Sequence, residues 1–187
     1  VGHFQAGLDY SLYQNGLFRT YAYPPQFNSA NLSIRSFVNR GPEKVIGSRD
    51  GLFYINEATG IVKSFVKPVL TSDLILTICF YEGEYYIGTY GGGMMVLNPQ
   101  TLSLKYFTQG DTELFQKGHI FCVKPDNRGN LWIGTSQGLF CYNGQTKQIK
   151  NFTSTNSQLP EGNVYEVSFD STGKGWIATE TGMCIYD

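Results

Sequence analysis

The stretch DNRGNLWIGTSQGLFCY, residues 126–142, decides the fold because it recurs along the chain. Degenerate copies read GKGWIATETGMCIYD at 173–187, EYYIGTYGGGMMVLN at 84–98 and EKVIGSRDGLFYIN at 43–56, and VGHFQAGLDYSLY at 1–13 is a copy entered partway through. The aligned glycines, Gly7, Gly51, Gly93, Gly138 and Gly182, are separated by 44, 42, 45 and 44 residues. A fixed period in this range is typical of a solenoid, a propeller or an array.

The order of elements within one unit selects among these architectures. In residues 119–153 the runs HIFCV, NLWIGT, LFCYN and KQIKNF are rich in β-branched and aromatic residues and are bounded by Gly, Asn and Asp. Short strands in this order predict one four-stranded blade of a β-propeller for each repeat. No segment shows a helical period, so we expect an all-β protein.

The blade repeats lie at approximately 1–23, 34–66, 74–107, 119–153 and 163–187. The first lacks its innermost strand and the last stops after its third strand, so we expect about four to five antiparallel blades, of which three are complete and two partial. Closure is what protects the edges of a propeller. Residues 1–187 are therefore expected to form a single segment, an arc of a larger propeller that the remaining blades of a parent protein or a second copy would complete. The start VGHF, without Met, agrees with a piece of a longer protein.

The repeated positions have expected structural roles. Gly51, Gly93, Gly138 and Gly182 are expected in the turn between the second and third strands, with positive φ. The hydroxyls of Ser48, Thr89, Thr135 and Thr179, at the end of the second strand, are expected to bond nearby backbone. Trp132 and Trp176 are expected to pack between neighbouring blades.

Composition excludes several function classes. The net charge is −1 and the chain has no basic stripe, so we expect no nucleic-acid partner. No apolar run approaches the ~20 residues of a membrane span, so we expect no direct membrane contact. The cysteines lie in apolar runs without a CxxC or Cys/His pattern. This predicts buried free thiols and no zinc or other cofactor, while disulfides remain possible. The cysteines are Cys79, Cys122, Cys141 and Cys184.

The best copy resembles the repeat of two-component-regulator propellers, D-x-x-G-x-L-W-I-G-T-x-x-G-L. The matching residues in this copy are Asp126, Gly129, Leu131, Trp132, Ile133, Gly134, Thr135, Gly138 and Leu139. The last repeat matches at Asp170, Gly173, Trp176, Ile177, Thr179 and Gly182 and departs at Gly175, Ala178 and Met183. The earlier copies keep fewer of these residues.

This resemblance implies a function for the parent protein. Such repeats build the periplasmic sensor of hybrid two-component histidine kinases, which is anchored in the inner membrane, responds to oligosaccharides released during glycan breakdown and relays the signal across the membrane. The kinase and regulator motifs of such a protein are absent from these residues. The segment itself is therefore expected to bind ligand without turnover.

The candidate ligand-binding residues lie in loops at one face of the propeller. Aromatic faces with convergent polar groups suit saccharides. Arg49, Tyr90, Gln137 and Glu180 are expected at one equivalent position after the second strand, Phe115 in the insertion-like loop GDTELFQKG, and His119 at the start of an inner strand. No nucleophile arrangement or linked carboxylate pair indicates catalysis. The alternatives are a protein-interaction scaffold of the WD type and, less favoured, a propeller enzyme that acts on glycans.

Overall fold

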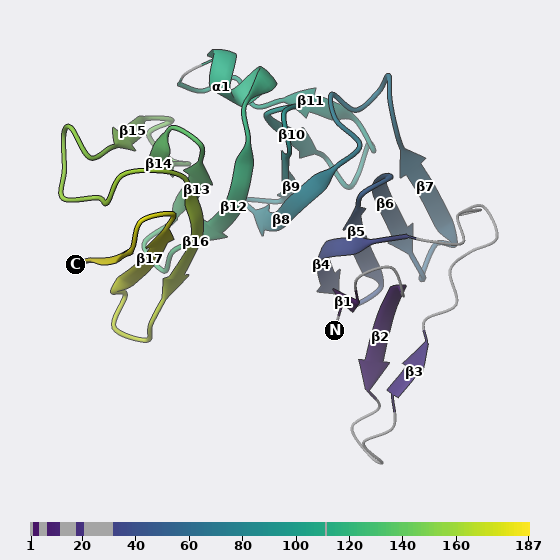
Figure 1. Ribbon diagram of the computed structural model, residues 1–187. Coiled ribbons are helices and arrows are strands. Elements are labelled where there is room, and N and C mark those ends of the chain that lie inside the picture. The colour runs from purple at the N-terminus through teal and green to yellow at the C-terminus, as the bar shows by residue number, and fades with distance from the viewer. Residues whose placement is uncertain (1, 4–6, 12–17, 21–31, 111) are drawn as a thin grey trace. The chain divides into compact units, whose positions relative to one another are not determined.

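The computed structural model of the protein describes residues 2–3, 7–11, 18–20, 32–110 and 112–187. The chain divides into two compact units, Val1–Ile75 and Leu76–Asp187. Each sheet is an antiparallel meander in which strands adjacent in sequence are hydrogen-bonded neighbours (Figure 1). This is the strand order that the repeat predicts for propeller blades, and the all-β propeller prediction is confirmed.

The first unit contains a three-stranded and a four-stranded sheet. The strands of the three-stranded sheet are β1 (Gly2–His3), β2 (Gly7–Ser11) and β3 (Phe18–Thr20). Those of the four-stranded sheet are β4 (Ile34–Arg40), β5 (Glu43–Ser48), β6 (Gly51–Asn56) and β7 (Ile61–Phe65). A core cluster that includes Ile34, Ile46 and Phe53 lies on one face of the four-stranded sheet.

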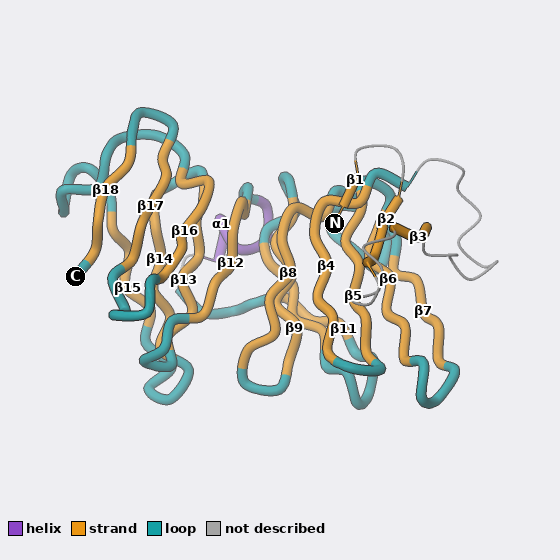
Figure 2. The backbone as a smooth tube through the Cα atoms, turned by 90° about the horizontal axis from the view of Figure 1, so that it is seen from below, coloured by secondary structure: helices purple, strands orange, loops and turns teal. Residues whose placement is uncertain are grey.

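The described part of the second unit contains the remaining sheets and a helix, and its strands run side by side within each sheet (Figure 2). The first sheet here has β8 (Ile75–Tyr81), β9 (Glu84–Thr89), β10 (Met94–Leu97) and β11 (Leu104–Tyr106). The next has β12 (Ile120–Pro125), β13 (Asn130–Thr135), β14 (Gly138–Asn143) and β15 (Ile149–Phe152). The last has β16 (Val164–Phe169), β17 (Gly175–Thr179) and β18 (Met183–Tyr186). Helix α1 (Thr112–Lys117) lies between β11 and β12.

Helix α1 corrects the expectation that no segment is helical. Its six residues lie in the loop GDTELFQKG, and the Gly118 N–H donates to the Leu114 carbonyl at 2.7 Å where the helix ends. A helix this short is not stable by itself. It forms because Leu114 and Phe115 are buried in the core, at 1% and 0% exposure, where their contacts offset the cost of ordering the turn.

The predicted roles of the turn residues are largely confirmed. Gly51, Gly93 and Gly138 have φ values of +129°, +71° and +106°. At Gly51 an added Cβ would also lie 2.6 Å from the Phe65 carbonyl oxygen, so both conformation and space require glycine there. Gly182 is different. Its φ is not positive and the space around its Cα is open, so the prediction of positive φ was wrong for this position.

The predicted hydroxyl bonds are confirmed in both units. Thr135 Oγ1 donates to the Gly138 carbonyl at 2.8 Å and accepts the Gln137 N–H at 3.0 Å. Ser48, Thr89 and Thr179 make the corresponding bond to Gly51, Gly93 and Gly182. These bonds close the turn after the second strand and hold the residue that follows each hydroxyl in a defined place.

The aspartate of the repeat fixes the orientation of its tryptophan. Asp126 accepts hydrogen bonds from the Asn130 side chain and from Trp132 Nε1, at 2.8 and 2.9 Å. Burial raises the pKa of Asp126, but the hydrogen bonds outweigh it and the pKa is lowered. Trp132 is 2% exposed and its ring lies 5.8 Å from Phe169 and 4.7 Å from Tyr186 in the following sheet. The prediction that Trp132 packs between blades is thus confirmed.

Trp176 occupies the same repeat position but is 40% exposed, so the predicted packing between blades is not seen for it in this chain.

The four cysteines are free thiols, of which Cys79 and Cys122 are buried and Cys141 and Cys184 are partly buried. Burial raises the pKa of Cys79 to about 11 and that of Cys122 to about 12, which keeps both thiols protonated.

Candidate functional site

A β-bulge at the start of the inner strands sets the geometry of the site. The pairing register shifts between Ile34 and Ser36, between Ile120 and Cys122, and between Val164 and Glu166. The residue inserted at each bulge is Arg35, Phe121 or Tyr165. A bulge re-aims the side chain of its extra residue. Accordingly Ile120 and Val164 are fully buried, whereas Tyr165 is 44% exposed.

In the second unit the bulge residues join the predicted site residues in a row of rings. Tyr90 and His119 have ring centroids 4.1 Å apart, with an interplanar angle of 39°. His119 lies 6.1 Å from Phe121, in a stacked orientation, and Phe121 meets Tyr165 edge-on at 5.1 Å. Tyr90 and Tyr165, at the two ends, are 51% and 44% exposed. We call these four residues the aromatic row.

Polar groups border the Tyr165 end of the row. Asn163 Nδ2 donates to the Tyr165 hydroxyl at 3.2 Å, and the Asn163 N–H donates to Glu180 Oε2 at 3.3 Å. The Glu180 N–H donates in return to the Asn163 carbonyl at 2.9 Å. The Thr181 hydroxyl donates to the Glu161 carbonyl at 2.6 Å. These bonds tie the loop before β16 to the turn before β18 and place a carboxylate beside an exposed aromatic ring.

The structure brings Tyr90, His119 and Glu180 into or next to this row, but it corrects the position of Gln137. In two repeats the residue after the hydroxyl donates its N–H to a backbone carbonyl before the inner strand: Arg49 to Ser33, and Glu180 to Asn163. In the best repeat Ser136 makes this bond, to the His119 carbonyl at 3.2 Å. Gln137 lies one residue further along the turn. Arg49 is exposed and belongs to the first unit, so it is described apart from the row.

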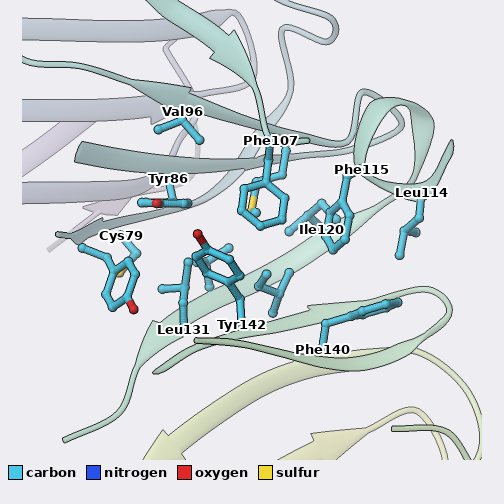
Figure 3. Packing of buried hydrophobic residues seen from close by; sticks show 14 residues of the cluster. Cys79, Tyr86, Val96, Phe107, Leu114, Phe115, Ile120, Leu131, Phe140 and Tyr142 are labelled. Carbon is cyan, nitrogen blue, oxygen red and sulfur yellow. The ribbon is translucent and has the colours of Figure 1, made fainter. Parts of the chain in front are cut away.

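Phe115 was predicted to contact a ligand, but the structure places it away from the surface. Its side chain is fully buried, and its ring meets Phe107 at 5.0 Å and Phe140 at 5.3 Å (Figure 3). The helix turns this aromatic residue into the core instead of presenting it to solvent. Phe121, Tyr165 and Asn163 were not among the predicted site residues. The spacing of Val164 and Val167 indicates the bulge. Both valines are buried although they are three residues apart, whereas buried residues of a regular strand are two apart.

The described ranges contain no group of three or more His, Cys, Asp or Glu residues that could hold a metal ion. None of the helices described is long and apolar enough to cross a membrane. His119 Nδ1 is buried and has no hydrogen-bond partner in the described part of the chain. The arrangement therefore offers stacking surfaces and hydrogen-bonding groups, which suits binding.

The comparisons with known proteins support the resemblance found in the sequence. Residues 115–137 match a sequence-family model described as "Two component regulator propeller". This span runs from α1 to the turn after β13. The prediction that the chain carries such repeats is confirmed by this match and by the solved structures described next. No curated protein matches the chain.

Several solved structures share the fold. The extracellular domain of BT3049 from B. thetaiotaomicron, assigned as a hybrid two component system, is 28% identical over 100% of this chain and 25% of its own length, with a TM-score of 0.73. PorZ, a surface component of the type-IX secretion system of Porphyromonas gingivalis, is 15% identical over 99% of this chain and 29% of its own, with a TM-score of 0.74. The WD40 β-propeller domain of Doa1 is 14% identical over 83% and 51%, with a TM-score of 0.61. The chain thus spans about a quarter of the length of the BT3049 domain.

Proposed function

We propose that this chain, which carries two-component-regulator propeller repeats, is a segment of the extracytoplasmic sensor of a hybrid two-component regulator. In this proposal it lies in the periplasm, binds glycan-derived oligosaccharides and passes the signal to parts of the protein beyond the membrane. The similarity to the extracellular domain of BT3049 over the whole chain supports the sensor role. The observation that carries ligand binding is the aromatic row with its bordering polar groups.

The chemistry of the row fits a saccharide. The C–H face of a pyranose packs on an aromatic ring, and its hydroxyls bond to carboxylate and amide groups. Tyr90 and Tyr165 offer exposed ring surface, and Glu180 and Asn163 offer polar atoms at the Tyr165 end. Phe121 and His119, which are partly buried, link the two exposed rings into one continuous surface.

We propose binding without turnover. A glycosidase needs two carboxyl groups on either side of the scissile bond, and the row is bordered by Glu180 at one end. The interaction-scaffold alternative receives no residue-level support, because the likeness to the Doa1 propeller rests on 14% identity and shows the fold alone.

Isothermal titration calorimetry of the purified chain against a panel of neutral and acidic oligosaccharides tests the proposal. We expect one class of oligosaccharide to bind, and we expect Tyr165→Ala and Tyr90→Ala each to weaken that binding by about tenfold or more, as expected for the loss of a stacking ring. Both side chains are exposed, so neither substitution should lower the melting temperature by more than a few degrees, ~2–4 °C.

Tyr106→Ala is the matched control, because Tyr106 is 43% exposed on β11 and lies outside the aromatic row. It should leave the affinity unchanged. Equal losses in all three variants would contradict the assignment of the row as the site. Release of product sugars during the titration would contradict the absence of turnover.

A further inference from the structure

The carboxylate of Glu180 is held at the Tyr165 end of the aromatic row by the loop before β16. Its Oε2 accepts the Asn163 N–H at 3.3 Å, and the Glu180 N–H donates to the Asn163 carbonyl at 2.9 Å. Gly162 has a φ of +99°, and an added Cβ there would lie 2.8 Å from the Glu180 Cβ and 3.0 Å from Oε2. A side chain at this position would therefore displace the carboxylate. The glycine lets the loop backbone lie against Glu180, although the glutamate itself is exposed.

The charge of this carboxylate is not balanced by a neighbouring side chain. In the parts of the chain that the structure describes, Glu180 forms no ion pair. The lysines of the adjoining strand β12 and of the β16–β17 turn have other partners, because Lys124 pairs with Glu166 at 3.3 Å and Lys174 with Asp187 at 3.0 Å. Glu180 is thus left to pair with a cation from solution.

The ring of Tyr165 adds a second attraction for a cation at the same place. Its hydroxyl accepts a hydrogen bond from Asn163 Nδ2 at 3.2 Å, so Asn163 contacts Tyr165 with its side chain and Glu180 with its main chain. The ring is 44% exposed. The face of a tyrosine ring attracts an ammonium group, and a carboxylate accepts a charge-assisted hydrogen bond from one. The two groups together suit a positively charged substituent on a sugar ring.

We propose that the aromatic row selects an oligosaccharide that contains an amino sugar with a free amine. This inference rests on the proposed oligosaccharide binding and names the class of ligand. The amino sugar stacks on Tyr165, and its ammonium group donates a hydrogen bond to Glu180. A neutral sugar leaves the carboxylate without a cationic partner, and a uronic acid is repelled by it. The remaining sugar units extend over Phe121 toward Tyr90.

Trisaccharides with one shared backbone isolate the contribution of the amine. Cellotriose, the glucosamine trimer and the N-acetylglucosamine trimer differ only in a hydroxyl, an amine or an acetamide on each ring. In isothermal titration calorimetry at low salt, we expect the glucosamine trimer to bind about fivefold or more tighter than cellotriose. The N-acetylglucosamine trimer should bind no better than cellotriose. High salt should reduce the preference for the amine, because exposed charges are screened.

Glu180→Gln should weaken binding of the glucosamine trimer more than binding of cellotriose, so that the preference falls below about twofold. Glu84→Gln is the matched control, because it removes the same charge from the start of β9, at the other end of that strand from Tyr90, and it should keep the preference.

No binding of the glucosamine trimer, binding equal to that of cellotriose, or a preference that survives Glu180→Gln would overturn this inference. The proposed oligosaccharide binding would still stand if the neutral or acidic oligosaccharides bound at the row. Failure of every oligosaccharide, with and without the amine, would overturn both.

Discussion

The contact between the sheets β8–β11 and β12–β15 is centred on Phe107 and Phe115, whereas the contact between β12–β15 and β16–β18 is centred on Trp132. In the first contact, Phe107 meets Tyr86, Phe115 and Tyr142 at centroid distances of 6.1, 5.0 and 5.2 Å. A groove of about 480 Å³ lies beside this cluster and is lined by Tyr86, Phe107 and Tyr142. In the second contact, Trp132 lies beside a groove of about 370 Å³ that Leu159 and Cys184 also line. Both contacts use the same repeat positions on their strands.

The connecting segments account for the difference. Before β12 the chain forms α1, which inserts Phe115 against Phe140. Before β16 it forms a loop without a helix, which contributes the smaller Leu159. In the last sheet, Cys184 occupies the position that Phe140 has in the preceding sheet. Ile133 pairs with Phe140, and Ile177, at the same repeat position as Ile133, pairs with Cys184. The repeat thus specifies the strands, and the loops decide which side chains are inserted between the sheets.

The largest effect is expected at the tryptophan of the second contact. Trp132→Ala should lower the free energy of unfolding by ~3–5 kcal/mol, because the variant leaves a cavity among Phe152, Phe169 and Tyr186. Trp176→Ala, at the same repeat position but 40% exposed, should cost about 1 kcal/mol or less. Urea denaturation followed by far-UV circular dichroism measures both. Equal losses would contradict the assignment of Trp132 as the buried member of the pair.

The first contact is tested at Phe115. Phe115→Ala should lower the free energy of unfolding by about 3 kcal/mol, because the ring contacts with Phe107 and Phe140 are lost from a fully buried site. Phe115→Leu keeps most of the volume and should cost less than about 1.5 kcal/mol. Denaturation in urea separates the two variants. A Phe115→Ala chain with unchanged stability and weakened oligosaccharide binding would instead support the role that the sequence predicted for this residue.

The sequence predicted the strands well because their signals are local. Alternating apolar residues, turn glycines and the hydroxyl after the second strand all act within one repeat. Phe115 could not be predicted in the same way. In GDTELFQKG polar residues flank Leu114 and Phe115 on both sides. Only contact with the neighbouring sheets determines that the segment folds as a helix and buries both side chains. Secondary structure in such a segment depends on tertiary contacts.

The candidate site was predicted in part for a related reason. Tyr90 and His119 were found because they follow fixed positions of the repeat. Phe121 and Tyr165 were missed because HIFCV and VYEVSF were treated as regular strands, in which these side chains would alternate with buried neighbours. The bulges exist only in the pairing with β13 and β17. Gln137 was assigned one residue too late along its turn, which the backbone bond from Ser136 reveals.

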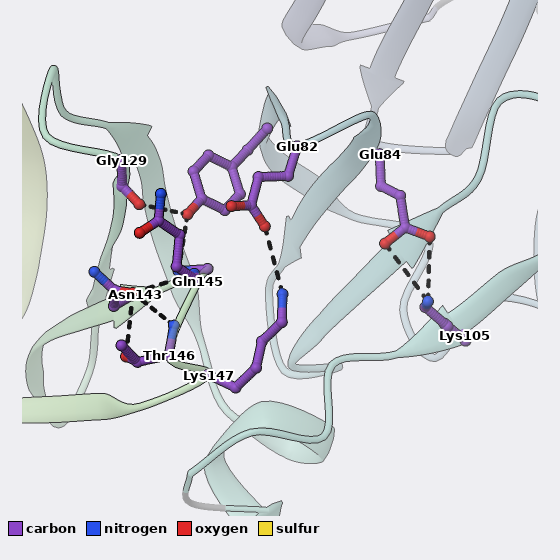
Figure 4. A network of polar contacts seen from close by, with 10 residues as sticks. Glu82, Glu84, Lys105, Gly129, Asn143, Gln145, Thr146 and Lys147 are labelled. Carbon is purple, nitrogen blue, oxygen red and sulfur yellow. Dashed lines mark hydrogen bonds and ion pairs between the residues drawn. The ribbon is translucent and has the colours of Figure 1, made fainter.

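A tyrosine hydroxyl forms a polar bridge across the first contact, and removing that one oxygen atom removes the bridge. The Tyr81 hydroxyl donates to the Gly129 carbonyl at 2.6 Å and accepts the Gly144 N–H at 3.0 Å. Burial raises the pKa of Tyr81 to about 12, so the phenol stays protonated and able to donate. Nearby, Lys147 pairs with Glu82 across the same two sheets (Figure 4).

Tyr81→Phe should therefore lower the free energy of unfolding by ~1–2 kcal/mol, because it leaves two backbone groups without their partner. Hydrogen exchange at the Gly144 amide should accelerate, since that N–H loses its acceptor. Tyr106→Phe, on the exposed edge strand β11, is the matched control and should change neither quantity. Unchanged exchange at Gly144 in Tyr81→Phe would mean that the bridge does not connect the two sheets in solution.

The smallest expected effect is a gain, obtained by making the second contact resemble the first. Cys184→Phe places a ring at the position of Phe140, where the groove beside Trp132 has room for it. We expect the free energy of unfolding to rise by ~0.5–1 kcal/mol, as for other cavity-filling substitutions. Cys122→Phe is the matched control. Cys122 is 1% exposed in a tightly packed cluster, so the larger side chain should destabilise the protein by ~1–3 kcal/mol. Urea denaturation should therefore show changes in the free energy of unfolding of opposite sign for the two variants. A lower free energy of unfolding in Cys184→Phe would show that the groove is closed in solution.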